Sequence, residues 1–111
     1  MSDTGPQVFE LEPERIYQPL LEGRPRTRGM RAGRVALGPG EECGAHSTGT
    51  HEETLVILSG RGVMKFAGGL EMELAGGRAV YVPPHTGHNV VAAPDDELRY
   101  VYVVAPIRDE D

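Results

Sequence analysis

The sequence predicts an all-β domain, a small antiparallel barrel or sandwich in which tight turns join short strands. Its 15 glycines and 9 prolines lie between short apolar runs and follow no tandem period. No segment stands out as a helix, and short strands alternating with dense turn signals are typical of a barrel or sandwich. At 111 residues, the chain is large enough for one modest core and too small for two domains.

We expect roughly seven to nine strands, each ending at a turn signal. The first covers residues 28–37 and stops at Gly38-Pro39-Gly40. The apolar run TLVIL at residues 54–58 predicts a strand that is buried on both faces. Gly68-Gly69 is a two-residue hairpin signal. The other expected strands cover residues 62–67, 70–74, 79–82, 89–92 and 99–104.

This pattern divides the chain into three parts. Residues 1–27 are expected to form an N-terminal arm, partly disordered, that is suited to cross onto a second subunit. Residues 28–106 form the single barrel, and residues 107–111 form an acidic tail. The acidic groups near both ends are best explained as solvated, solubilising residues.

Charge and composition exclude several partners. The net charge of −6 and the pI near 5.2 argue against nucleic-acid binding, which needs a basic surface. No apolar run approaches the ~20 residues that span a bilayer, and the first residues lack the features of a signal peptide. The chain is therefore expected to be cytoplasmic. Cys43 is the single cysteine, which excludes an intrachain disulfide and fits a reducing compartment.

One basic segment stands apart from this acidic background. Its five arginines are Arg24, Arg26, Arg28, Arg31 and Arg34. One interpretation is a charged face on an edge strand, where charge prevents edge-to-edge pairing. The other is that one guanidinium points into the barrel and clamps a substrate carboxylate. The sequence does not select which arginine that would be.

The first informative motif combines histidine and carboxylate with two glycines. Gly40 precedes His46 by five intervening residues, and Glu53 precedes Gly60 by six. Histidine and carboxylate at strand ends, framed by turn residues, are what a barrel needs to hold a metal ion.

The second motif follows about thirty residues later along the chain. Gly77 precedes Pro83 by five intervening residues, and His88 stands five positions after Pro83. Together the two motifs resemble the two signature motifs of the cupin superfamily. The resemblance covers roughly residues 38–104 and implies a jelly-roll barrel with one metal site.

The chain departs from the cupin pattern at several positions. Thr48 stands where the second histidine of the first motif is expected, so three of the four usual ligands remain. His51 lies two residues before Glu53 and shares its face in an extended segment, so it is a candidate for the fourth ligand. His85 replaces a motif glycine and Ala92 replaces a motif asparagine.

The resemblance and the residue chemistry together predict the site. The candidate metal ligands are His46, His51, Glu53 and His88. Imidazole and carboxylate suit a divalent transition metal such as Fe, Mn, Zn, Ni or Co. If His51 is not a ligand, it is available as a base. The candidate substrate-pocket residues are Tyr81, His85, Tyr100 and Tyr102, for which core or turn roles are the competing interpretation.

Three functional hypotheses follow from this site. The first is a metal-dependent enzyme of oxygenase, isomerase or lyase type that acts on a small polar organic molecule. The alternative is a non-catalytic module that binds a small ligand or a metal through a degenerate cupin site. A metal-free isomerase is a third reading, against which Glu53 counts. The resemblance further implies a homodimer.

Overall fold

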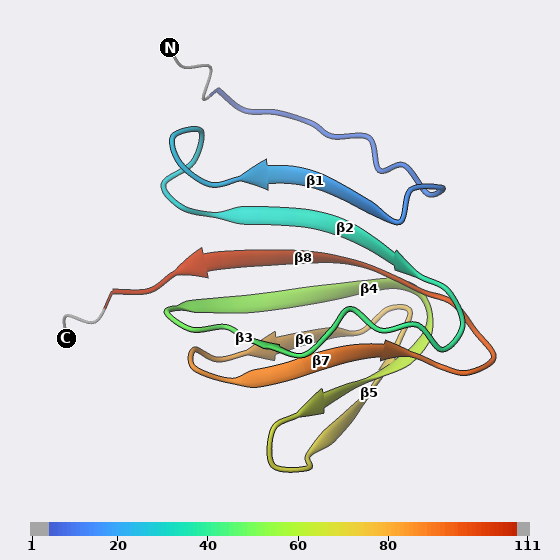
Figure 1. The fold of residues 1–111 in the computed structure, drawn as a ribbon. Helices are drawn as coiled ribbons and strands as arrows, with labels where there is room; N and C mark the ends of the chain where they lie inside the picture. Colours follow the sequence, from blue (N-terminus) through green and yellow to red (C-terminus); the bar gives the residue numbers. More distant parts are fainter. Residues whose placement is uncertain (1–4, 109–111) are drawn as a thin grey trace.

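The computed structural model describes residues 5–108 and contains only strands, turns and loops there (Figure 1). The first four residues, and most of the predicted acidic tail, lie outside the described range. No helix in the described part is long and apolar enough to cross a membrane. The strands are β1 (Tyr17–Glu22), β2 (Arg31–Leu37), β3 (His46–Ser47), β4 (His51–Phe66), β5 (Glu71–Ala75), β6 (Ala79–Val82), β7 (Gly87–Ala92) and β8 (Leu98–Pro106).

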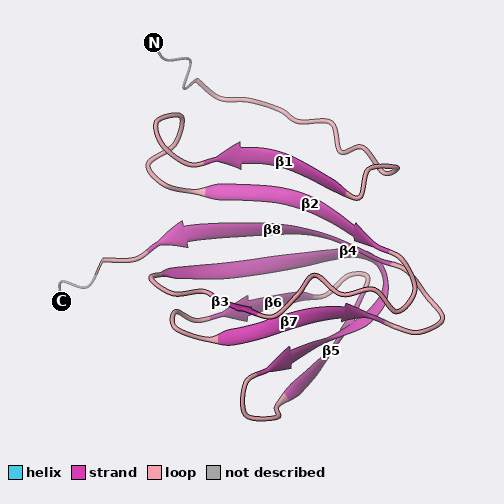
Figure 2. Cartoon of the chain, viewed as in Figure 1, coloured by secondary structure: helices cyan, strands magenta, loops and turns pink. Residues whose placement is uncertain are grey.

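The strands form a curled antiparallel sheet, which confirms the predicted all-β barrel class (Figure 2). The strand order along the sheet is β1-β2-β8-β4-β7-β3, and β5 and β6 also pair with β4. The interpretation of the arginine-rich segment as an edge strand is wrong, because β2 lies between β1 and β8. β1 falls within residues 1–27, the stretch predicted as an arm, and pairs with β2 along its length.

The long strand β4 organises the barrel because it belongs to both halves of the sheet. Its first half pairs with β6 and β8, and its second half pairs with β5 and β7. Gly60 lies at the change of partner with φ at 89°, and a Cβ there would lie 1.8 Å from the carbonyl oxygen of Glu97. Only glycine fits this position. The strand therefore continues through a glycine at which the sequence predicts a break.

The core lies on the concave face of the sheet, and burial alternates along β7 and the first half of β4, as period two requires. In β4, Leu55 and Ile57 are 1% and 2% exposed, whereas Val56 and Leu58 are each 44% exposed. The prediction that residues 54–58 are buried on both faces is therefore wrong. The core consists of Leu37, Leu55, Ile57, Met64, Leu74, Val82, Val90, Ala92, Leu98 and Tyr100.

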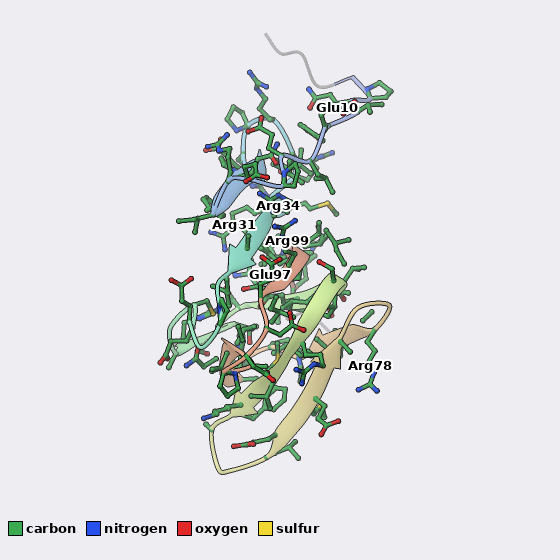
Figure 3. All side chains as sticks on the ribbon, turned by 90° about the vertical axis from the view of Figure 1, so that its right-hand side faces the viewer. Glu10, Arg31, Arg34, Arg78, Glu97 and Arg99 are labelled. Carbon is green, nitrogen blue, oxygen red and sulfur yellow. The ribbon has the colours of Figure 1, made fainter. Side chains whose placement is uncertain are left out.

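The convex face of β1 and β2 is covered by the segment that precedes β1. The guanidinium of Arg34 is buried there, and its Nη2 donates hydrogen bonds to the carbonyl oxygens of Glu12 and Arg15. Gln18 donates to the carbonyl of Glu10 at 2.9 Å. Figure 3 shows Arg34 and Arg31 on opposite sides of β2, so the arginines of this segment lie on both faces of the sheet.

Candidate metal centre

Three of the predicted ligands converge on the concave face of the sheet, where His46 is exposed, Glu53 half-buried and His88 buried. His46 comes from β3, Glu53 from β4 and His88 from β7, and one ligand atom from each lies within 4.8 Å of the others. His46 and His88 are register partners across the β3–β7 ladder. The short strand β3, which the sequence did not predict, therefore holds His46 opposite His88.

Backbone carbonyls fix the orientation of both imidazole rings. Nδ1 of His46 lies 2.9 Å from the carbonyl oxygen of Gly44, and Nδ1 of His88 lies 3.0 Å from that of Thr86. A carbonyl oxygen can only accept, so each Nδ1 carries the proton. Each Nε2 then points towards the centre of the group, which is the arrangement that metal-binding histidines adopt.

His88 and Glu53 form the most buried charged contact of the site. Nε2 of His88 lies 3.1 Å from Oε1 of Glu53, and their side chains are 1% and 10% exposed. The hydrogen bond to Glu53 raises the pKa of His88 above its usual range, although burial opposes this. With no metal bound, the pair is held together by a proton on Nε2, and a metal ion would compete for that position.

The donor set fits a divalent transition metal. Two ligand atoms at about 2.0–2.2 Å from one ion lie at most about 4.4 Å apart, so the group, whose ligand atoms lie within 4.8 Å of one another, would contract on binding an ion. Two imidazoles and one carboxylate leave further coordination positions free for water or a small chelating molecule. The structure therefore supports a three-residue centre.

Thr48, which replaces the second histidine of the first motif, has a structural role. It is 8% exposed, and its hydroxyl donates to the carbonyl oxygen of Pro83 at 2.7 Å. The same hydroxyl accepts from the backbone N–H of Thr86 at 3.0 Å. Thr48 therefore ties the loop after β3 to the turn before β7, and these two segments carry the two histidines.

Three other predicted site residues are not brought into this group. His51 is the first residue of β4 and pairs with Pro106; it lies outside the ligand cluster. It shares the face of Glu53, but two residues along a strand are about 6.7 Å apart. His85 has φ of 55° in the turn before β7. Tyr81 is 54% exposed and donates a hydrogen bond to Glu52.

The triad of His46, Glu53 and His88 lies against a cavity of about 480 Å³, a suitable size for a small organic molecule. Tyr100 and Tyr102 line it, as do the three triad residues. Burial raises the pKa of Tyr100 most, with a further contribution from Cys43. Burial also raises the pKa of Tyr102, and its hydrogen bond to Tyr17 raises that pKa further. Both phenols therefore stay protonated and act as hydrogen-bond donors near neutral pH.

The structure adds residues that the motifs did not indicate. Tyr17 and Arg31 line the cavity, and the hydroxyl of Tyr17 lies 2.8 Å from that of Tyr102. The rings of this pair are nearly parallel, with centroids 6.4 Å apart. Asn89 accepts a hydrogen bond from the N–H of Gly44 at 2.9 Å and so positions the loop that orients His46. No local signal marks Tyr17, because its place depends on pairing between β1 and β2.

The fold and the site define a small single-domain β-barrel whose two motifs bring histidine and glutamate together on its concave face. A sequence model of the family described as Cupin domain matches residues 33–104, which include all three triad residues. The chain belongs to the cupin family, as its resemblance to the two cupin motifs predicted.

Solved structures share this fold. A cupin protein from Bacteroides fragilis superposes with a TM-score of 0.75 at 21% identity, covering 95% of this chain and 87% of that one. A cupin-like protein from Thermotoga maritima gives a TM-score of 0.75 at 25% identity, covering 80% and 66%. A chain described as a DMSP lyase gives 0.68 at 20% identity, covering 86% and 49%. A comparison with curated protein sequences found no match.

Proposed function

We propose that this cupin is a metal-dependent enzyme that acts on a small polar organic molecule. The observation that carries the proposal is the convergence of His46, Glu53 and His88 within 4.8 Å beside a cavity of about 480 Å³. A divalent transition metal bound there would supply Lewis acidity toward a ligand oxygen. The proposed reaction class is an oxygenase, isomerase or lyase, and the fold alone does not choose among them.

The residues around the cavity have separate tasks under this proposal. Tyr100 and Tyr102 present phenolic donors that orient a polar ligand, because their hydroxyls stay protonated. The aliphatic part of the lining consists of Leu21, Val35, Leu55, Val90 and Val104. This aliphatic surface would contact the carbon skeleton of a bound molecule. One neighbour in fold is described as a lyase, which is compatible with the lyase branch.

The alternative, a non-catalytic module for a small ligand or a metal, is favoured by one observation. The hydroxyl of Thr48 is fully used in holding Pro83 and Thr86, so this position contributes no ligand. A centre with three protein ligands binds metal more weakly than one with four. Such a site could keep the cavity and lose the chemistry.

The test begins with metal analysis of tag-free protein purified without added metal or chelator. Near-stoichiometric iron, manganese, zinc, nickel or cobalt is expected, and His88→Ala should abolish it. The metal-loaded protein is then screened for turnover of small carboxylates and carbonyl compounds under air and under nitrogen. Protein that neither contains metal nor takes it up on titration would overturn the enzyme proposal. Stoichiometric metal without turnover would favour the binding module.

We also propose that the protein forms a homodimer in the cytoplasm. Val56, Leu58 and Tyr81 are exposed on the convex face of the sheet, and an apolar face of this kind is typical of a subunit contact. The lone Cys43 is exposed, which suits a reducing compartment. Light scattering after size-exclusion chromatography should give twice the mass of one chain for the wild-type protein. The Val56→Glu variant should give the mass of a single chain. A monomeric wild-type protein would overturn the dimer.

A further inference from the structure

The cavity contains one cation that the metal centre does not use. Arg31 lines the cavity together with Glu53, and both residues pair with Val104 from opposite sides: Arg31 in β2 and Glu53 in β4. Their Cα atoms are therefore two strand spacings apart, about 10 Å. Both side chains project from the same face of the sheet because partners in one row share a face.

Arg31 has no carboxylate partner among the described residues. Glu22 pairs with it across β1 and β2 and also lines the cavity. Yet the ion pairs found in the described part of the chain do not include Arg31. The guanidinium of Arg34, by contrast, is buried on the opposite face beneath the arm (Figure 3). Of these two arginines, Arg31 alone is placed to meet a ligand in the cavity.

A second donor group stands next to Arg31 on the same face. Tyr102 is two residues from Val104 in β8 and stacks against Tyr17, with the two hydroxyls 2.8 Å apart. Two hydroxyls carry two protons, and their mutual hydrogen bond uses one. The tyrosine pair therefore has one proton left to donate to a ligand. Arg31 and this pair together offer the donors that a carboxylate requires.

The charge balance of the cavity also favours an anion. With a divalent ion bound, the metal and Arg31 contribute three positive charges. The cavity carboxylates, Glu53 and Glu22, contribute two negative ones. The cavity is then net positive in a protein whose net charge is −6. A small anion is therefore drawn to this cavity and repelled by most of the remaining surface.

From these observations, we infer that the cavity selects small organic acids. Arg31, together with the neighbouring Tyr17–Tyr102 pair, binds a carboxylate of the ligand, and a different polar group of the same ligand faces the triad. This rests on the proposed function and names its substrate class. The ligand carries one polar group toward His46, Glu53 and His88 and a carboxylate toward Arg31. The planar guanidinium binds that carboxylate through two parallel hydrogen bonds, which a lysine ammonium does not reproduce.

Titration calorimetry with succinate, its neutral analogue succinamide and the monoacid acetate tests this inference, with metal content measured on every sample. Wild-type protein should bind succinate, and succinamide should bind far more weakly. Arg31→Gln should weaken succinate binding about 10- to 100-fold and leave acetate binding and metal content unchanged. Arg31→Lys should recover only part of the loss. Arg28→Gln, which removes an arginine outside the cavity lining, should behave as wild type.

The outcomes separate this inference from the proposed function. Full metal content with equal succinate binding by wild type and Arg31→Gln overturns the inference and leaves the metal centre standing. Failure of metal-loaded wild-type protein to bind succinate also overturns it. Succinate binding that depends on Arg31 in protein that holds no metal supports the inference. In that case the enzyme proposal fails and the binding module remains.

Discussion

His46 and His88 are register partners on β3 and β7, and their ring centroids lie 4.3 Å apart at an interplanar angle of 61°. Both Nδ1 atoms are held by carbonyl oxygens two residues earlier in the chain, those of Gly44 and Thr86. The two imidazoles are therefore oriented by the backbone before any ion arrives. A site that is oriented in advance loses little entropy on binding.

The first prediction separates a three-ligand centre from a four-ligand centre. His46→Ala, Glu53→Ala and His88→Ala should each weaken metal binding by more than the roughly 10- to 100-fold typical of outer-shell changes. His51→Ala should retain the wild-type affinity, because His51 lies outside the cluster. Competition titration with a chromogenic chelator measures all four. If His51→Ala lost as much metal affinity as His46→Ala, His51 would have to be counted as a ligand again.

The second prediction concerns pH in the metal-free protein. Glu53 raises the pKa of His88, so the pair stabilises the fold fully below the unfolded value of about 6.5. This contribution is lost as the pH rises through the higher folded value. Glu53→Gln should therefore lower the free energy of unfolding more at about pH 6 than at about pH 9. Urea titration in the presence of chelator measures the difference. A deficit that grows with pH would contradict the assignment.

The local pattern of the sequence predicted most strands but not how they pair. The strand at residues 79–82 was predicted with the bounds that β6 has. Glycines at 60 and 62 indicated a break, yet β4 continues because Gly60 takes a positive φ and bends the strand. β1 was missed because its sequence, YQPLLE, contains Pro19 and becomes a strand only through pairing with β2.

The site was predictable where spacing carries the information. His46, Glu53 and His88 stand at motif positions, and the structure brings them together. The two-residue spacing also placed His51 on the same face of the strand as Glu53. Sharing a face, however, does not bring two residues within reach of one ion, because they stay separated along the strand. Arg31 could not be selected from its neighbours, because its place beside Val104 is set by the register between β2 and β8.

The third prediction concerns the residue that replaces a motif histidine. Thr48→Val keeps the shape of the side chain and removes the hydroxyl that joins Pro83 and Thr86. Because the site is buried, the free energy of unfolding should fall by about 1–3 kcal/mol. Metal affinity should fall too, since the joined segments carry both histidines. Thr50→Val, at an exposed position, is the control. Equal stability of the two variants in urea unfolding would contradict this role.

The fourth prediction concerns the space beneath Tyr102. A Cβ on Gly33 would lie 2.8 Å from the hydroxyl oxygen and 2.9 Å from Cε2 of that ring. Gly33→Ala should therefore displace the ring, break its hydrogen bond to Tyr17 and cost about 1–3 kcal/mol. In a Tyr102→Ala background the same change should cost much less. A double-mutant cycle measures this coupling, and additive effects would show that the ring does not depend on Gly33.

The fifth prediction concerns the segment that covers the convex face. Arg34 is buried and donates to the carbonyl oxygens of Glu12 and Arg15, while its Nε and Nη1 have no partner. Replacing a buried charge by an apolar residue of similar size is often neutral for global stability. Arg34→Met should therefore change urea unfolding little but release the segment. Trypsin cleavage after Arg15 should become at least about tenfold faster.

The control for this experiment is Arg28→Met, which removes one tryptic site as Arg34→Met does. Arg28 is exposed, so cleavage after Arg15 should proceed in this variant at the wild-type rate. Mass spectrometry of the early fragments identifies the cleaved bond. Equal rates in the two variants would show that Arg34 does not hold the segment against β1 and β2. Its burial would then reflect packing against the sheet alone.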